Sequence, residues 1–323
     1  MKSNNKKAAE GKLTPNDMLS GSQIATVMGL NPYQGPNEPL KLAFDAVHGI
    51  KPKEIDFEGF HWGNTMEVPI IEEACKRLAL EDVKTTFNKA FFNDYAPFAV
   101  SLDATVQGDG RIVNSNADLG IQTDGPVALT GLGIIEAKLT SHEKEVDLPE
   151  YRGKVQLQAQ MDTLGASWGA VCVLYKGIYL KIFVYARDET MIDAIRSTAR
   201  DFDRRVKKYK ENEETDWFDF TQTKEAIAVF NQAELNTVNI KELEEEVQVI
   251  NELNEEIRER KKQLEMHSAL VMGKMGAHQH LVAGRFNVTW GEINYKATME
   301  KIIPAKAART IRLKTLKVRE NHG

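Results

Sequence analysis

The stretch that most constrains the fold runs from residue 101 to residue 138, because both of its ends alternate apolar and polar residues with the period of a β-strand. At the first end Ser101 and Asp103 share one face, and the apolar face consists of Phe98, Val100 and Leu102. At the second end Glu136 and Lys138 share one face, and the opposite face consists of Ile135, Ala137 and Leu139. The alternation therefore predicts two strands, each with one polar face.

Side chains two residues apart point the same way from a strand, so the Glu136 carboxylate and the Lys138 ammonium are expected side by side. Asp103 could join them from a neighbouring strand. Carboxylates are hard oxygen ligands of the kind that Mg²⁺ prefers, and an amine beside them can orient a water molecule or help to deprotonate it. The alternative is a solvated surface pair, since Glu-x-Lys on its own is a very common sequence.

Composition predicts an ordinary globular protein of a reducing compartment. Hydrophobic residues make up 42% of the 323 residues and charged residues 28%. Cys75 and Cys172 lie far apart in apolar runs, which predicts buried thiols and a cytoplasmic location. No apolar run approaches the roughly 18 residues that span a membrane. Residues 1–13 are polar and lysine-bearing, so we expect a disordered tail there rather than a signal peptide.

Charge is distributed unevenly along the chain. The net charge is −5, but residues 285–323 carry nine Lys or Arg against three Asp or Glu, a net of +6. The other 284 residues therefore carry a net of −11. The basic segment is suited to nucleic acid or to an acidic partner, and an enzyme that encloses DNA can line its channel with cations while its outside is acidic.

Ser22 is predicted at the amino terminus of a helix. Ile24, Val27 and Met28 follow it at helical spacing, and Gly29 can end the turn. The hydroxyl and the first free amides of such a helix can bind an anion such as phosphate. The alternative is that Ser22 is an ordinary N-cap.

A second helix is predicted over residues 62–80. Its apolar stripe consists of Met66, Ile70, Ile71, Ala74, Cys75 and Leu78. Glu67 lies on this stripe, where a carboxylate needs a partner. It could reach a metal, directly or through water, or it could form a capping box with Asn64.

The segment 107–133 is rich in Gly, Asn and Asp and is predicted to be an inserted loop or an extra hairpin at the rim of the sheet. It contains Asp124, which competes with Asp103 as the carboxylate that joins Glu136. We favour Asp103, because its strand alternation is regular and because Gly125-Pro126 after Asp124 is typical of a turn.

Residues 150–164 are predicted to form a helix that ends at Gly165. Gln156 and Gln158 lie in this helix, and helical glutamines are usually solvated. Residues 170–175 and 178–185 are predicted strands joined by a turn at Lys176-Gly177, and a helix is expected over 188–209. The core is expected to end near residue 220, which divides the chain into a tail at 1–13, a core at 14–220 and an appendage at 221–323.

The appendage has a heptad pattern between residues 240 and 271. One column is apolar throughout and consists of Leu243, Ile250, Ile257, Leu264 and Val271. A second column becomes polar along the chain and consists of Ile240, Val247, Asn254, Lys261 and Ser268. The pattern predicts a helix packed on a partner, either within the chain or on a neighbouring subunit, rather than a long parallel dimer. Residues 285–290 and 309–316 alternate apolar and polar residues with the period of a strand.

Five short motifs occur in the order found in the YqaJ-type viral recombinase family, which is related to phage lambda exonuclease within the PD-(D/E)xK nuclease superfamily. They are Gly21-Ser22-Gln23-Ile24-Ala25, Trp62-Gly63-Asn64-Thr65-Met66-Glu67, Ser101-Leu102-Asp103-Ala104, Ile135-Glu136-Ala137-Lys138 and Gln156-Leu157-Gln158-Ala159-Gln160-Met161. The resemblance covers roughly residues 15 to 190. It departs from the family near Ser22, where the usual Arg is missing and Lys12 is the nearest preceding cation.

The resemblance implies an α/β fold with a central mixed sheet flanked by helices. A helical hairpin or coiled segment would follow, and then a small β element in which residues 285–290 and 309–316 form a strand pair. It implies that Asp103, Glu136, Lys138 and Gln158 are catalytic. The metal ligands would be Asp103, Glu136, Glu67 and the Ala137 carbonyl, and Ser22, Ser101 and Gln156 would contact DNA or its 5′-phosphate. The cofactor would be one or two Mg²⁺ ions, or Mn²⁺ in their place.

The implied activity is 5′-to-3′ exonuclease digestion of linear double-stranded DNA in a bacterial or phage-infected cell. The product would be a 3′ single-stranded overhang for a single-strand annealing protein, and the enzyme would be a trimeric ring. Two alternatives remain: a nicking or structure-specific endonuclease of the same superfamily, and a non-catalytic scaffold that binds DNA ends.

Overall fold

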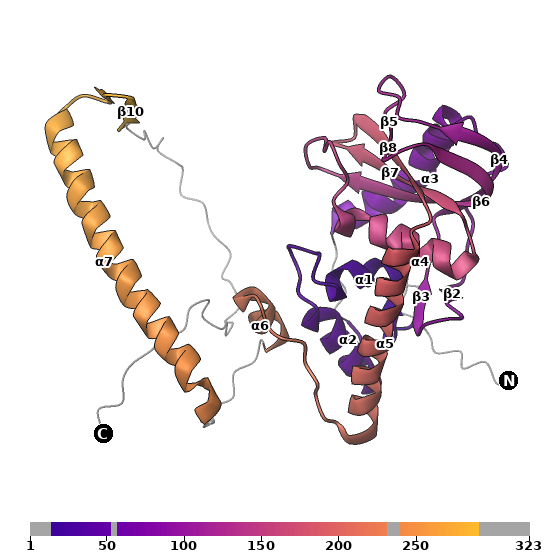
Figure 1. Cartoon of the computed structure of the whole chain (residues 1–323), viewed down its shortest axis with the longest axis horizontal. Helices are drawn as coiled ribbons and strands as arrows, with labels where there is room; N and C mark the ends of the chain where they lie inside the picture. Colours follow the sequence, from indigo (N-terminus) through magenta and orange to yellow (C-terminus); the bar gives the residue numbers. More distant parts are fainter. Residues whose placement is uncertain (1–13, 53–56, 231–239, 291–323) are drawn as a thin grey trace, which may run out of the picture. The chain divides into compact units, whose positions relative to one another are not determined.

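The computed structural model of the chain describes residues 14–52, 57–230 and 240–290. The chain divides into two compact units, Met1–Val229 and Phe230–Gly323 (Figure 1). The candidate residues of the nuclease motifs all lie in the first unit, and the heptad segment lies in the second.

A mixed five-stranded sheet forms the centre of the first unit. In spatial order the strands are β4 (Ala104–Val113), β6 (Val127–Thr140), β7 (Trp168–Tyr175), β8 (Tyr179–Ala186) and β5 (Ile121–Thr123). The β4–β6 and β7–β8 pairs are antiparallel, whereas β6–β7 and β5–β8 are parallel. The expected central mixed sheet is therefore present.

Helices cover both faces of this sheet (Figure 1). On one side α3 (Glu58–Arg77) packs on β6 and β7, and on the other side α4 (Lys154–Leu164) packs on the same strands. Two further helices, α1 (Gly21–Val27) and α5 (Glu189–Asn212), pack on α4, and α2 (Asn37–Val47) packs on α1 and α5. Neighbouring residues of β6 reach opposite layers, since Ile134 packs on the α4 side and Ile135 on the α3 side. This alternation confirms the predicted period.

The first predicted strand is interrupted. Its apolar part is β3 (Phe98–Val100), which lies in a separate sheet between β1 (Leu19–Ser20) and β2 (Phe91–Phe92). Strands β2 and β3 are antiparallel, with Phe91 opposite Val100. Residues 101–103 then connect this small sheet to β4 of the central sheet. Asp103 therefore lies at the junction of the two sheets and not within one continuous strand.

The segment 107–133 is more than the expected loop or extra hairpin at the rim, because it contributes to both edges of the central sheet. Strands β4 and β6 pair along most of it, from Ala104 opposite Ile135 to Val113 opposite Val127. The intervening residues reach the far edge of the central sheet, where β5 pairs with β8. The Gly, Asn and Asp residues of this segment indicate its turns. They do not indicate strand β5, which has only three residues and is too short for a periodic signal.

Three predicted helix boundaries shift in the structure. Helix α1 begins at Gly21 after the N-cap Ser20, so Ser22 lies inside its first turn. Helix α3 begins at Glu58 and not at residue 62. The helix expected over 150–164 is divided at Gly153, whose φ of 127° separates the 3₁₀ turn η1 (Glu150–Arg152) from α4. The predicted stop at Gly165 is confirmed, since this glycine adopts the left-handed conformation.

Several other expectations are confirmed. The β7–β8 turn is at Lys176-Gly177, and both residues have positive φ. The helix expected over 188–209 is α5, which runs from Glu189 to Asn212 after the N-cap Asp188, whose side chain accepts a hydrogen bond from the Met191 amide. Cys75 and Cys172 are free, buried thiols. None of the helices in the described ranges is long and apolar enough to cross a membrane.

The first unit extends beyond the residue 220 expected from the sequence. Helix α6 (Thr223–Val229) places Glu225 in the interior, where its carboxylate accepts a hydrogen bond of 2.7 Å from the Asn37 amide at the start of α2. An acceptor at a helix amino terminus satisfies an otherwise unpaired N–H group. Residues 223–229 therefore belong to the packing of the first unit.

In the second unit, η2 (Lys241–Leu243) leads into the long helix α7 (Glu244–Met275), which confirms that the heptad segment is helical. A hairpin follows, in which β9 (His280–Ala283) pairs with β10 (Phe286–Thr289). The strand expected at 285–290 is thus formed. Its expected partner at 309–316, the basic segment after residue 290 and the tail at 1–13 lie outside the described residues.

The packing of β6 against β7 predicts that Gly133→Ala destabilises the first unit. A Cβ atom at Gly133 would lie 2.1 Å from the indole of the fully buried Trp168. Overpacking of this kind costs about 1–3 kcal/mol of unfolding free energy, to be measured by urea denaturation. Gly125→Ala is the matched control, because a Cβ there meets nothing within 4 Å. Equal stability of the two variants would contradict this account of the interface.

Candidate active site

The Glu136 carboxylate is the centre of the site. It projects from β6 and is only 1% exposed, so its charge needs close partners. Lys138 Nζ donates to its Oε1 at 2.6 Å, and Gln160 Nε2 donates to its Oε2 at 2.6 Å. The first contact confirms that residues 136 and 138 share a strand face. The second brings in α4, which lies across that face.

Asp103 joins this cluster from the junction before β4. Its Oδ2 accepts a hydrogen bond of 2.9 Å from the Ala137 amide, just beyond the last rung of the β4–β6 ladder at Ala104 and Ile135. The Asp103 side chain thus takes a position that backbone would occupy in a longer strand. Because a strand residue directs its N–H and C=O to the same side, the Ala137 carbonyl faces this edge as well.

The carboxylates interact strongly. Burial raises the pKa of the Asp103 carboxyl, and the nearby Glu136 carboxylate raises it further, to about 8, although the Lys138 ammonium and the Ala137 amide oppose the rise. Burial also raises the pKa of Glu67 on α3, and Glu136 adds to that rise. Glu67 therefore lies within electrostatic reach of the other two acids. Like charges held this close favour the binding of a cation or a proton.

Lys138 is the one cation in direct contact with this group among the described residues. Burial lowers the pKa of its ammonium, but Glu136 and Asp103 outweigh burial and hold the pKa above its ordinary value. Its Nζ also donates to Gln156 Oε1 at 3.1 Å, and the side chain is 32% exposed. Lys138 is therefore charged, fixed by two acceptors and still accessible from solvent.

A pocket of about 400 Å³ opens beside the cluster. Three predicted DNA contacts, Ser22, Ser101 and Gln156, line it together with Glu67 and Asp103. The rest of the wall consists of Thr14, Ser20, Gly21, Asn64, Thr85, Phe87, Val100 and Leu102. The wall within the described residues contains no Lys or Arg, and Lys12, the cation closest before Ser22 in sequence, lies outside those residues.

Ser22 does not cap its helix. The N-cap is Ser20, whose hydroxyl lies 3.2 Å from the Ser22 hydroxyl and donates to Gln23 Oε1 at 2.9 Å. The Ser22 side chain is exposed and faces the pocket. Its placement is thus compatible with a phosphate contact, although the sequence pattern placed the start of the helix two residues too late.

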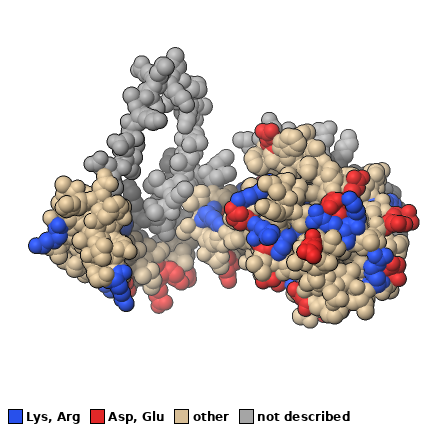
Figure 2. Space-filling model, turned by 90° about the horizontal axis from the view of Figure 1, so that it is seen from above, with Lys and Arg blue, Asp and Glu red and all other residues tan. Residues whose placement is uncertain are grey.

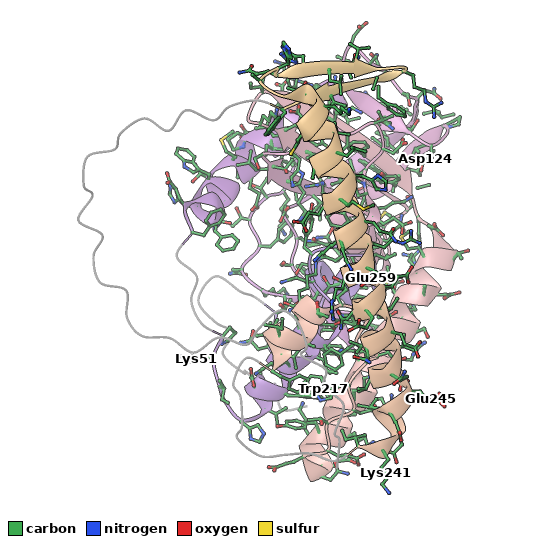
Figure 3. All side chains as sticks on the ribbon, turned by 90° about the vertical axis from the view of Figure 1, so that its left-hand side faces the viewer. Lys51, Asp124, Trp217, Lys241, Glu245 and Glu259 are labelled. Atoms are coloured by element: carbon green, nitrogen blue, oxygen red, sulfur yellow. The ribbon has the colours of Figure 1, made fainter. Side chains whose placement is uncertain are left out.

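Asp124, the rival of Asp103, lies apart from the cluster. It follows β5 at the surface of the first unit (Figure 3), and its side chain is 74% exposed. Its recorded ion-pair partner is Lys154, at 3.9 Å. The structure therefore brings Asp103, and not Asp124, to Glu136.

Gln158 is also separated from the carboxylates. Its Nε2 donates to the Ala186 carbonyl, and its Oε1 accepts from the Asp188 amide, each at 2.9 Å. These bonds fasten α4 to the connection between β8 and α5. The structure therefore contradicts the placement of Gln158 at the reacting groups and gives it a structural position.

Gln160 was missed as a site residue, although the sequence contains a signal for it. Residues four apart share a helix face, whereas residues two apart point to nearly opposite sides. Gln156 and Gln160 are four apart and both reach the cluster, and Gln158 between them points away. Gln160 Nε2 also donates to the Ser101 carbonyl at 2.9 Å, which ties Glu136 to the junction that carries Asp103.

The donor set is suited to a divalent cation. Asp103, Glu136 and Glu67 supply three carboxylates against the single Lys138 ammonium, which leaves an excess of negative charge when all are ionised. Within the described residues, no group of three His, Cys, Asp or Glu is already close enough to enclose a metal. Mg²⁺ does not require such a cage, because it usually takes one or two carboxylates and keeps several waters.

Charges on the surface of the first unit are mixed. On the face shown in Figure 2, Lys and Arg are interleaved with Asp and Glu and do not gather on one side. This face therefore has no continuous basic surface that would indicate where a polyanion binds. The pocket beside the carboxylates is the more specific indication of a binding site.

No family model matches the chain, and no curated protein matches it. Among solved structures it is similar to LHK-Exo, an alkaline exonuclease from Laribacter hongkongensis. The two chains are 17% identical, with a TM-score of 0.44 over 61% of this chain and 91% of that chain. It is also similar to a phage-related exonuclease from Haemophilus somnus 129PT, at 13% identity and a TM-score of 0.37, over 59% of this chain and 96% of that chain. Scores this low carry no argument about activity, so the function must be argued from the site.

The contacts of Gln160 predict that Gln160→Leu is destabilising. The substitution removes a 2.6 Å donor from a buried carboxylate, and an unpaired buried polar group costs about 1–3 kcal/mol, more if charged. Gln156→Leu is the control, because its partner Lys138 is partly exposed and keeps its bond to Glu136. Urea unfolding should show the larger loss for Gln160→Leu. A loss of similar size in both variants would contradict the anchoring role of Gln160.

Proposed function

We propose that the protein is a Mg²⁺-dependent 5′-to-3′ exonuclease that digests linear double-stranded DNA. The observation that carries the proposal is the convergence of Asp103, Glu136 and Lys138 beside a pocket that Ser22 also lines. Carboxylates at a strand edge with a fixed ammonium beside them form a site for hydrolysing a phosphodiester. Residues from all five motifs of the sequence resemblance lie at or beside this site. In the fifth motif the contacting residue is Gln156 and not the expected Gln158.

The residues that would hold one or two Mg²⁺ ions, or Mn²⁺ in their place, are Asp103, Glu136 and the Ala137 carbonyl, with Glu67 nearby. When bound, such an ion neutralises charge on the phosphate and lowers the pKa of a bound water. The excess of acid over base in the cluster supports this assignment. Each Glu136 oxygen accepts one hydrogen bond, from Lys138 or from Gln160, which leaves a second lone pair on each oxygen for a cation.

Lys138 and Gln156 would position the attacking water. In the reaction, the water oxygen forms a bond to phosphorus, the bond from phosphorus to the 3′-oxygen breaks, and that oxygen leaves with a proton. The Lys138 ammonium is held by Glu136 and Gln156, so it needs little reorganisation to stabilise the negative charge that develops on the phosphate. Gln156 Oε1 accepts from Lys138, which leaves its amide N–H groups free to face the pocket that it lines.

The pocket supports action at a DNA end. It places Ser22 and Ser101 beside Asp103, and its volume of about 400 Å³ lies within the range of pockets for small ligands. A terminal phosphate held by these hydroxyl groups would set the next phosphodiester against the acids. This step fixes where cleavage occurs and gives the enzyme its preference for an end.

Three further parts of the proposal rest on the motif resemblance alone. The enzyme would act as a trimeric ring around DNA, which would make digestion processive. It would leave a 3′ overhang for a single-strand annealing protein. It would work in the cytoplasm of a bacterial or phage-infected cell.

The first test compares two aspartates. Purified wild-type protein should release nucleotides from linear duplex DNA in Mg²⁺, and chelation should stop the reaction. Asp103→Asn removes a carboxylate of the cluster and should abolish release, whereas Asp124→Asn should retain wild-type activity because Asp124 is 74% exposed and lies elsewhere. Melting temperatures of both variants control for folding.

Each other result of this test would indicate a different function or a different assignment of the site residues. Activity that survives chelation would refute the metal-dependent mechanism. Cleavage of closed circular DNA would identify an endonuclease. Binding of DNA ends without hydrolysis by the wild-type protein would identify a scaffold. An active Asp103→Asn variant beside a folded but inactive Asp124→Asn variant would show that the carboxylate has been assigned to the wrong residue.

The second test concerns Lys138→Ala. Loss of a positioned ammonium should lower the rate of hydrolysis by about 10² or more, because such groups stabilise charge that develops in the transition state. Binding of a DNA end should change little. Lys176→Ala is the control, since that lysine pairs with Glu143 at an exposed turn. A parallel loss of binding and rate would instead identify Lys138 as a phosphate clamp.

A further inference from the structure

Helix α7 exposes a long apolar seam. The seam consists of Leu243, Ile250, Ile257, Leu264 and Val271, which repeat every seven residues. Four of them are exposed, from 36% for Val271 to 67% for Leu264, and Ile250 is half-buried. Within the second unit no other described helix is long enough to cover α7. Contiguous apolar surface of this kind usually marks an interface.

A second column of residues completes a heptad pattern. Ile240 and Val247 begin this column, and Asn254, Lys261 and Ser268 continue it with polar side chains. In coiled-coil terms the seam occupies the d positions and this column the a positions. The pattern therefore describes a helix that pairs with one other helix along its length. A monomeric surface helix would be expected to turn this face to its own core.

The charge of α7 and its first turn is divided between two halves. Residues 240–257 contain seven Glu and one Lys, a net charge of −6, whereas residues 258–275 contain five Lys or Arg and two Glu, a net charge of +3. Figure 3 shows Lys241 and Glu245 near the amino-terminal end of α7 and Glu259 near its middle. The helix is thus complementary to a reversed copy of itself.

The direction of pairing follows from these charges. In a parallel pair the acidic halves would lie side by side, and Lys261 would face its own equivalent across the seam. In an antiparallel pair each acidic half lies along a basic half, and each Lys261 lies against the acidic half of the other helix. Opposite charges beside the core set orientation and partner choice in coiled coils. The charges therefore favour the antiparallel arrangement.

We propose that α7 pairs with α7 of a second copy of this chain as an antiparallel coiled coil. The 32-residue helix is about 48 Å long, which allows several layers of seam contacts in each pair. The inference does not depend on the proposed nuclease activity, because it uses no residue of the first unit. Whatever assembly the first unit forms, pairing through α7 would join two such assemblies.

The seam is tested by the mass of the full-length protein in solution. Ile257→Glu combined with Leu264→Glu places charges on the seam without disturbing a buried core, and it should halve the mass measured by light scattering. Val249→Glu combined with Leu270→Glu is the matched control, since both side chains are exposed apolar residues of the same helix outside the seam. The control should keep the wild-type mass.

Direction is tested by fluorescence energy transfer between labelled copies. Labels are placed on Glu245→Cys and Lys274→Cys, near the two ends of α7, and the native thiols Cys75 and Cys172 are buried. Antiparallel pairing predicts strong transfer when a donor at 245 meets an acceptor at 274 on another copy. Transfer should be weak when donor and acceptor are both at 245.

Two results would overturn the proposal. A wild-type mass that the seam variant leaves unchanged would show that the seam does not join two copies and is covered in some other way. Stronger transfer between labels at the same position would show that the pair is parallel. A melting temperature equal to that of the wild-type protein would show that the seam variant is folded.

Discussion

The site depends on the burial of one charged group, the Glu136 carboxylate. At 1% exposure, this group would be strongly unfavourable without partners. Its two oxygens are each bonded at 2.6 Å, one to Lys138 of the same strand and the other to Gln160 of α4. Gln160 also holds the Ser101 carbonyl, next to the junction that carries Asp103. The hydrogen bonds of Gln160 to Glu136 and to the Ser101 carbonyl therefore fix the positions of α4 and of residues 101–103 relative to β6.

Much of this arrangement could be predicted from the sequence, because strands have a strict period of two. That period placed Glu136 and Lys138 on one face and the apolar residues of β6 on the other, as the structure has them. The choice of Asp103 over Asp124 had the same basis, together with the motif resemblance at residues 101–104 and a turn signal after Asp124. Asp103 lies beside Glu136 as predicted, even though its strand is interrupted. Its side chain accepts a hydrogen bond from the Ala137 amide at the end of the β4–β6 ladder, in place of a backbone carbonyl.

The failures have local physical causes. In a helix, residues two apart diverge, so the motif with Gln156 and Gln158 could not supply two contacts to one site, and Gln160 supplies the second. Two serines close together both satisfy the rules for an N-cap, and only the backbone shows that Ser20 is the cap. Strand β5 has three residues, which is too few for a periodic signal, and its place beside β8 depends on pairing with a strand some 60 residues later. The division at Gly153 requires a φ of 127°, which the sequence permits without requiring.

The electrostatics of the pocket limit how a polyanion could enter it. Three carboxylates face one ammonium, and the described pocket wall has neither Lys nor Arg, so a phosphate approaching alone meets a surplus of negative charge. Burial is the largest cause of the rise of the Asp103 pKa, and the neighbouring Glu136 carboxylate raises that pKa further, to about 8. The neutral glutamines of α4 orient the acids but cannot cancel their charge. Under the proposed function a cation would therefore have to accompany the phosphate, and the affinities for the two would be coupled, each raising the other as linkage requires.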